Sequence, residues 1–301
     1  MVPRTPSKQR SKVTAGSAGD APELRRPPFA VAAHDGPQEV ADEIMACFER
    51  LAARKDSMAH AHALAMRSIG IGDGDPLYRA GRAIARDIDR GIGAGVPHGY
   101  HNARHFLEAM LCALYLARLS KLDRRRSSRV VTAALIHDFH HDGSRSSEAP
   151  FRLEALACVE AEPYLQREGV TPRLRQQIQA LVLATEPSCG VPFARDCVAH
   201  HADGAPAPAL ADAPQALSRL ISESDLALDA VLLAEADVLP SIGMTVEHGE
   251  RTQANLATEW GVSLGIEDKL AFVDRVAGNI TLARFFAPNI EALRQAYLRR
   301  L

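Results

Sequence analysis

The sequence lacks the features that mark several special classes of protein. Its 301 residues carry a net charge of −2, so no strong overall field attracts nucleic acid or a membrane surface. No apolar run approaches the roughly 18 residues that span a bilayer, and no apolar segment follows the first basic residues as in a secretory signal. These absences favour a cytoplasmic globular protein with neither a nucleic-acid nor a membrane partner.

Cysteine is also sparse and unpaired. The five cysteines are scattered and form no CxxC motif. An odd number of cysteines without a secretory signal is typical of reduced, buried thiols. We therefore expect free thiols, as in a cytoplasmic protein.

The first 36 residues have almost no apolar periodicity and are rich in Pro, Ser, Ala and Gly. They hold six Lys or Arg against three Asp or Glu, which makes this segment basic. Such a composition cannot bury enough apolar surface to offset the entropy of the chain. We expect a disordered basic tail over residues 1–36, followed by one domain over residues 37–301.

Helical periodicity dominates from residue 37 onward. Val40, Ile44, Phe48 and Leu51 recur at three- and four-residue spacing. Two further segments begin with the start signals of helices, Asp75 before Pro76 and Thr171 before Pro172. No segment alternates with period two over a useful length, so the predicted fold class is all-α. Further helices are expected over 101–119, 125–139, 150–168, 208–232, 250–260, 266–286 and 288–300.

Histidine is concentrated in one part of the chain. Six of the twelve histidines, with two aspartates, lie in or beside "YHNARH" (100–105) and "LIHDFHHDG" (135–143). On a helix that starts at residue 101, His101 and His105 would share a face. The segment before His137 is apolar nearly all round, so a buried helix would end at His137 and Asp138.

A buried His-Asp pair needs partners, and a metal ion satisfies both groups. Imidazole and carboxylate together suit Zn, Fe, Mn or Mg. A single buried histidine is more often a hydrogen-bonded core residue, and His60, His62, His200, His201 and His248 are expected to be of that kind or to lie on the surface. Several coincidences would be required for the cluster around residues 101–141, so the sequence predicts a metal site there.

These two stretches resemble the HD-domain metal-dependent phosphohydrolases, and most closely the class I cyclic-nucleotide phosphodiesterases. That family carries Y-H-N-x-x-H and H-D-x-x-H-x-G, and this chain has "YHNARH" and "HDFHHDG". A later A-D-[LI] segment of the family is matched to "LISESDLAL", a helix with a glutamate to "FRLEALA", and A-T-D to "LVLATEP". The resemblance extends over most of residues 98–286 and implies a single helical catalytic domain.

The resemblance also implies roles for residues in this chain. A first divalent metal would be bound by His105, His137, Asp138 and Asp225. Asp138 would bridge to a second metal, with His141, Glu154 and Glu186 in its surroundings. His101 would be the general acid, held cationic by a carboxylate such as Glu186, and Tyr100, Lys269 and Phe272 would contact the substrate.

The chain departs from the family pattern at several positions. Asp142 stands in place of a proline, Ser146 in place of Asn or Gln, and Ser222 in place of a histidine. None of these changes removes an implied metal ligand. The fourth departure is Lys269, which occupies the position matched to a purine-reading glutamine. Lysine cannot accept a hydrogen bond, so the usual amide readout of a purine edge fails.

Three functions remain open from the sequence. The first is a dimetal phosphodiesterase that acts on a 3′,5′-cyclic nucleotide. The second is a broader HD phosphohydrolase that acts on nucleoside mono- or triphosphates or another phosphoester. The third is a non-catalytic nucleotide-binding module. Retention of His101 beside the ligands favours an enzyme over the third.

Overall fold

The computed structural model describes residues 29, 35–145, 149–210 and 213–301. Within these residues it contains α-helices, short 3₁₀ turns and one isolated bridge between Gly95 and Asn102, but no strand. The predicted all-α fold class is confirmed. The α-helices are α1 (Pro37–Ala52), α2 (Ser57–Ser68), α3 (Pro76–Asp89), α4 (Ala103–Leu119), α5 (Arg124–Ile136), α6 (Arg152–Arg167), α7 (Pro172–Leu183), α8 (Gly190–Asp203), α9 (Ser218–Ser222), α10 (Ser224–Ile242), α11 (Val246–Trp260), α12 (Ile266–Ala277) and α13 (Ala287–Leu298).

Several helices start where the sequence places a capping residue. The Asp75 side chain accepts a hydrogen bond from the backbone N–H of Leu77, and Thr171 does the same for Leu174. Asn102 caps α4 by accepting from the N–H groups of Arg104 and His105. These bonds satisfy donors that the first turn of a helix leaves free. The cap at Asn102 also excludes His101 from α4, contrary to the expectation that this helix starts at residue 101.

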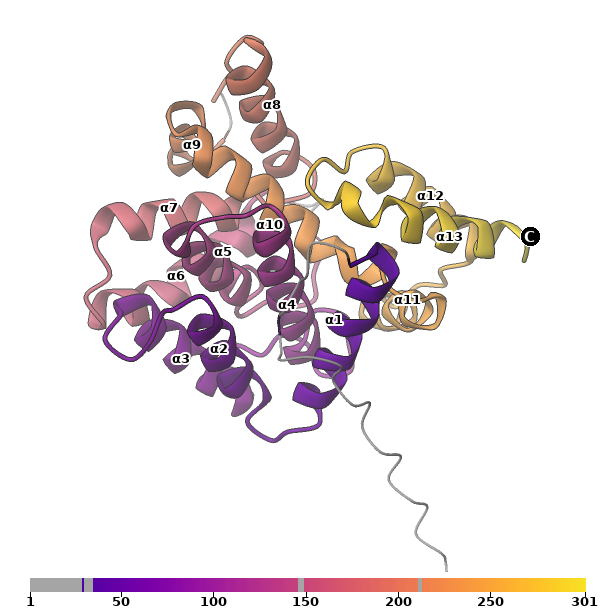
Figure 1. The fold of residues 1–301 in the computed structure, drawn as a ribbon, viewed down its shortest axis with the longest axis horizontal. Helices are drawn as coiled ribbons and strands as arrows, with labels where there is room; N and C mark the ends of the chain where they lie inside the picture. Colours follow the sequence, from indigo (N-terminus) through magenta and orange to yellow (C-terminus); the bar gives the residue numbers. More distant parts are fainter. Residues whose placement is uncertain (1–28, 30–34, 146–148, 211–212) are drawn as a thin grey trace, which may run out of the picture.

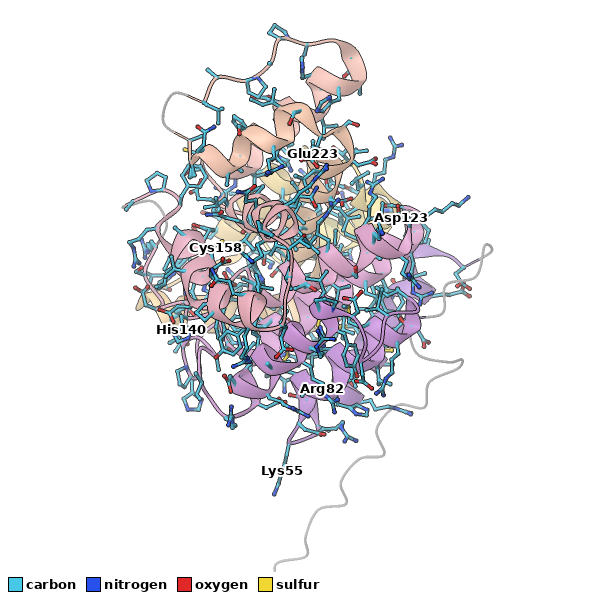
Figure 2. All side chains as sticks on the ribbon, turned by 90° about the vertical axis from the view of Figure 1, so that its left-hand side faces the viewer. Lys55, Arg82, Asp123, His140, Cys158 and Glu223 are labelled. Carbon is cyan, nitrogen blue, oxygen red and sulfur yellow. The ribbon has the colours of Figure 1, made fainter. Side chains whose placement is uncertain are left out.

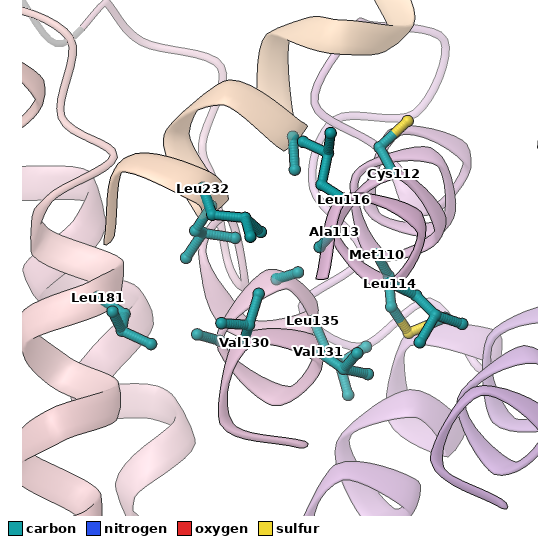
Figure 3. Close-up of a cluster of buried hydrophobic side chains, with 14 of the residues drawn as sticks. Met110, Cys112, Ala113, Leu114, Leu116, Val130, Val131, Leu135, Leu181 and Leu232 are labelled. Carbon is teal, nitrogen blue, oxygen red and sulfur yellow. The ribbon is translucent and has the colours of Figure 1, made fainter. Parts of the chain in front are cut away.

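The core is built on α4, α5 and α10. Helix α4 packs against both of the others, and Figure 3 shows their buried aliphatic side chains interleaved, with Leu181 of α7 beside them. Every residue of α5 from Val130 to Ile136 is buried, as its apolar pattern predicts. Burial of each large aliphatic side chain contributes about 1.5–3 kcal/mol. The end of α5 is therefore fixed in the interior.

The other helices surround this core in the order shown in Figure 1. Helices α2 and α3 pack against each other at one side, and α6 and α7 adjoin α3 and α5 respectively. Helix α10 runs from α9, past α4 and α5, to α11. Helices α11, α12 and α13 lie at the far end of α10, near the C-terminus (Figure 1).

The expected helix boundaries were wrong in the second half of the chain. Helix α8 occupies residues 190–203, where Gly190 suggested a loop. The expected helix over 208–232 is a coil from 204 to 210, a 3₁₀ turn and then α9 and α10. The expected helix over 266–286 ends at Ala277 and is followed by the 3₁₀ turn η3 (Ala283–Phe286).

Ser146, one of the departures noted above, lies outside the described residues.

Phe29, Asp35 and Gly36 are the described residues of the expected tail, and Phe29 lies well before the first helix. Its side chain is 1% exposed, and its ring lies 6.2 Å from that of Tyr115 on α4 in an edge-to-face arrangement. This residue therefore belongs to the core, whereas the rest of residues 1–34 lies outside the described part of the chain. Among the helices of the described residues, none combines the length and apolarity needed to cross a bilayer.

Candidate metal centre and active site

Two histidines and two aspartates converge where the end of α5 meets the start of α4 and the second half of α10. The Nε2 atoms of His105 and His137 lie 3.3 Å apart. One oxygen of Asp138 lies 3.1 Å from each of these nitrogens. One oxygen of Asp237 lies 3.0 Å from His105 Nε2 and 3.5 Å from His137 Nε2. The four side chains thus direct their donor atoms to one point.

The position of His137 follows from the buried end of α5. The Nδ1 atom of His137 lies 2.8 Å from the backbone carbonyl oxygen of Ala134. A carbonyl oxygen only accepts, so Nδ1 donates its proton and Nε2 is left as a free lone pair facing the cluster. A backbone bond on the far nitrogen is the usual support of a metal-binding histidine.

The charges of this cluster fit a divalent cation. Burial alone would lower the pKa of His105, but the adjacent Asp138 and Asp237 carboxylates raise it to about 9. The two histidines in turn keep the pKa of Asp237 below its usual range, against the effect of burial. Neutral imidazoles beside two carboxylates leave two negative charges, which one divalent ion balances. The donor set therefore suits the ion expected from the sequence.

Asp225, the expected fourth ligand, does not belong to this cluster. Its side chain is 69% exposed and lies 2.8 Å from the Arg126 guanidinium at the start of α5. Helix α10 runs parallel to α5, so that Asp225 lies beside the start of α5 and Asp237, about three turns later, beside its end. The sequence match was therefore placed too early on α10. The dipeptide Ala236–Asp237 fits the A-D segment better than Ser224–Asp225 and could have indicated the right residue.

Asp138 also takes part in a second group. His101, Asp138 and His141 bring one donor atom each within 4.8 Å of one another. The rings of His101 and His141 stack with centroids 3.8 Å apart. The Nδ1 atom of His141 accepts a hydrogen bond from the Gly143 N–H at 3.0 Å, so the neutral ring carries its proton on Nε2. His141 can thus donate to a water or a phosphate oxygen, and burial lowers its pKa to about 4.

Glu259, at the end of α11, holds His101 in place. Its Oε1 lies 2.6 Å from His101 Nδ1, while Oε2 accepts the backbone N–H groups of Tyr100 at 2.8 Å and His101 at 2.9 Å. The Glu259 side chain is fully buried. Burial raises its pKa, but the hydrogen bond and charge of His101 outweigh that effect and keep the pKa low. No sequence signal pointed to Glu259, because the pair joins residues 158 positions apart.

Glu186 was expected near His101, and the structure gives it a different role. It is completely buried, and its carboxylate accepts the backbone N–H groups of Ser188, Cys189 and Gly190 at 3.1, 2.5 and 3.1 Å. These bonds cap the start of α8. Glu186 therefore acts on the fold, and the carboxylate that contacts His101 is Glu259.

Glu154, which the resemblance placed near a second metal, lies on the first turn of α6. Its side chain is buried, and Oε2 has no hydrogen-bond partner among the described residues. Burial raises its pKa to about 7, with further contributions from the charges of Asp138 and Glu186. A buried carboxyl with a free oxygen beside Asp138 is suited to hold water around a cation.

The three expected substrate residues divide into two groups. The ring of Tyr100 lies 4.4 Å from that of His105 and 4.9 Å from that of His101, so it lines the cluster. Lys269 and Phe272 lie on α12, with the Lys269 ammonium 5.5 Å from the Phe272 ring centroid. Among the described contacts, neither Lys269 nor Phe272 touches the histidine cluster. Lys269 instead packs beside Gly249 of α11.

Comparison with solved structures identifies the architecture. The phosphodiesterase domain of the RhoPDE fusion protein from the choanoflagellate Salpingoeca rosetta matches with a TM-score of 0.57 at 15% identity, over 91% of this chain and 94% of that one. The fold is that of a phosphodiesterase domain. A second structure of that rhodopsin phosphodiesterase domain matches with a TM-score of 0.57 at 15% identity, over 89% of each chain. LmjPDEB1 in complex with IBMX matches with a TM-score of 0.59 at 14% identity, over 84% of this chain and 90% of that one.

Comparisons of sequence find no match, in contrast to the comparison of structures. No protein-family model matches the chain, and no curated protein matches it in a sequence search. The similarity is therefore one of fold, with identities of 14–15%. Within that fold, the His/Asp cluster offers a set of donor atoms that could hold a metal ion.

Proposed function

We propose that this protein is a metal-dependent phosphodiesterase that hydrolyses a 3′,5′-cyclic nucleotide to the nucleoside monophosphate. The observation that carries the proposal is the convergence of His105, His137, Asp138 and Asp237 beside the His101–Glu259 pair. A phosphodiesterase-like fold supports it.

His105, His137, Asp138 and Asp237 would hold a first divalent ion. Asp138 would also face a second ion, because it belongs to both donor groups, with Glu154 and His141 binding the surrounding water. Such ions supply positive charge for the phosphate oxygens and lower the pKa of water. The remaining chemistry, which is alignment and proton delivery, comes from the side chains of this chain.

His101 would donate the proton to the departing 3′-oxygen. Because Glu259 accepts from Nδ1, the opposite nitrogen, Nε2, is presented to the site. The stacked His141 ring and the neighbouring Tyr100 ring limit rotation of His101. A positioned histidine of this kind contributes about 10²–10⁴-fold to the rate.

The described residues say less about which base the substrate carries than about its phosphodiester group. Lys269 is 4% exposed and its side chain packs beside Gly249, so the amide that would read a purine edge has no counterpart at this position. Phe272 would contribute an apolar face to the same substrate.

The five free cysteines support a cytoplasmic location, where thiols stay reduced.

Turnover of a nucleotide panel with Mn²⁺ or Mg²⁺ added tests this function. The panel contains cyclic AMP, cyclic GMP, cyclic CMP and cyclic UMP, together with the corresponding 5′-monophosphates and triphosphates. Release of 5′-monophosphate from a cyclic nucleotide is the expected result. Phosphate release from the linear nucleotides without cleavage of any cyclic one would favour the broader phosphohydrolase. Tight binding without any product would favour a non-catalytic nucleotide-binding module.

A further inference from the structure

A basic groove lies between α2, α3 and α6, apart from the histidine cluster. It encloses about 740 Å³, within the range of roughly 300–1,000 Å³ for small-molecule sites. In Figure 2 the labels of Lys55 and Arg82 mark this part of the molecule, and the Lys55 side chain extends away from the helices. The cations that line the groove are Lys55, Arg67, Arg82, Arg86, Arg90 and Arg167.

Three of these arginines form a regular row along α3 and its C-terminal cap, Arg90. Arg82, Arg86 and Arg90 follow one another at intervals of four residues, so they lie on one face about 6 Å apart along the helix. Arg67 on α2 and Arg167 on α6 complete the row from either side. Guanidinium groups bind phosphate oxygens in a planar, two-pronged arrangement, so such a row is suited to successive phosphates.

The acidic residues that line the groove already have partners. Asp89 accepts the backbone N–H groups of Met58 and Ala59 at 2.9 and 3.0 Å and thereby caps α2. Asp87 accepts from the Tyr164 hydroxyl at 2.5 Å and pairs with Arg90. The third acid, Asp56, pairs with Arg54, outside the groove lining, at 2.9 Å. Arg90 is therefore paired, and Arg67, Arg82 and Arg167 have longer contacts to Asp73 and Glu168, at 3.8, 3.6 and 3.4 Å. Lys55 and Arg86 are the lining cations for which the described residues show no ion pair. Exposed contacts of this length contribute little, so the groove keeps a net positive charge.

Two of the arginines keep donors that no acceptor in the described part of the chain occupies. Arg86 is exposed and has no ion pair or hydrogen bond among the described residues. The Nε atom of Arg82 is buried without a hydrogen-bond partner, and its nearest carboxylate contact, to Asp73, is 3.6 Å long. A buried donor without an acceptor is unfavourable, and a bound acceptor would remove that cost.

We propose that this groove is a binding site for a small polyphosphate anion, such as the triphosphate of a nucleotide. A small ligand fits better than a nucleic acid, because the charge is confined to a hollow and the whole chain is slightly acidic. The site is separate from the proposed metal centre. Tyr164 and Arg167 lie at the end of α6, whereas Glu154 lies at its start, about 15 Å away along the helix.

Calorimetric titration of the full chain with ATP and, separately, with inorganic tripolyphosphate tests the proposal. We expect saturable binding of at least one anion at physiological ionic strength. The double substitution Arg82→Gln and Arg86→Gln should weaken it at least about tenfold, because it removes two charged donors to the phosphate oxygens. Glutamine keeps a high helix propensity, so α3 should remain folded.

Two control proteins make the result decisive. Arg125→Gln with Arg299→Gln removes the same charge from exposed positions outside the groove and should leave the affinity unchanged. Asp237→Ala alters the metal centre and should also retain binding. Equal binding of both anions would identify the phosphate chain as the ligand, and binding of ATP alone would identify a nucleotide. Failure of both to bind, or binding lost in Asp237→Ala but not in the double arginine variant, would overturn the proposal.

Discussion

The carboxylate of Glu259 lies 2.6 Å from Nδ1 of His101 and joins the end of α11 to the loop before α4. The same carboxylate accepts two backbone N–H groups, so it fixes the loop as well as the ring. The orientation of His101, the proposed general acid, and the position of the proton on its Nδ1 therefore depend on Glu259, a residue far from it in sequence.

Glu259→Gln should lower kcat on a cyclic nucleotide while the metal content stays normal. The amide keeps the size of the side chain but removes the charge that stabilises a protonated His101. We expect a loss approaching the roughly 10²–10⁴-fold of acid catalysis, measured by steady-state kinetics with metal analysis in parallel. Glu247→Gln, an exposed change on the same helix, is the matched control. Unchanged kcat in Glu259→Gln would remove Glu259 from the mechanism.

His101→Ala and His105→Ala should have different effects on metal content, stability and turnover, although the two rings lie only 5.7 Å apart. His105→Ala should lose metal and thermal stability together, because metal binding supports the fold. His101→Ala should keep its metal and its fold but lose roughly 10²–10⁴-fold in turnover. The loss should shrink for a p-nitrophenyl phosphodiester, whose leaving group departs without a proton. Equal impairment on both substrates would show that His101 is not the acid.

Lys269 should make the protein less stable at neutral pH than at high pH. Burial lowers its pKa from 10.5 to about 8, so the cost of the buried charge is present below pH 8 and disappears as the pH rises to 10.5. Lys269→Met should therefore raise the free energy of unfolding at pH 7 by up to about 3 kcal/mol. Chemical denaturation between pH 7 and 10.5 measures this gain, which should vanish at the upper end. Lys55→Met, at an exposed site, should show no such gain; a pH-independent effect of Lys269→Met would contradict the account.

Phe29 should contribute to stability although it lies before the first helix. Its burial against Tyr115 predicts that Phe29→Ala lowers the free energy of unfolding by about 3–5 kcal/mol without changing kcat. Removal of residues 1–26 should leave stability unchanged, whereas removal of residues 1–36 should reproduce the Phe29→Ala loss. Thermal denaturation of the three proteins tests this; equal stability of both truncated proteins would mean that Phe29 packing contributes nothing.

The helical fold and the centre of the site could be predicted because their signals are local. Apolar periodicity and capping residues such as Asp75 and Thr171 act within a few residues, and both caps are present in the structure. The apolar body of α5 indicated that His137 and Asp138 would lie in the interior. Helix α8 was missed because its start is capped by Glu186, a carboxylate four residues before Gly190, instead of by the residue next to it.

The parts of the site that depend on helix register could not be predicted in the same way. Asp225, Asp229 and Asp237 all lie on α10, and composition alone does not tell which one reaches the end of α5. In the structure Asp225 forms an ion pair with Arg126, and Asp229 forms ion pairs with Arg126 and Arg129. Asp237 is the aspartate that lies beside the histidines. Glu259 depends on the packing of α11, which no local pattern encodes.

The metal content and turnover of Asp237→Ala, measured beside Asp225→Ala, test the central claim most directly. Both substitutions remove one carboxylate from the same helix, but only Asp237 faces His105 and His137. Asp237→Ala should lower metal affinity by more than the roughly 10–100-fold that loss of an outer partner costs, and should abolish cleavage of the cyclic nucleotide. Asp225→Ala should keep both its metal and its activity. Normal metal content and activity in Asp237→Ala, or their loss in Asp225→Ala alone, would contradict the proposed metal centre.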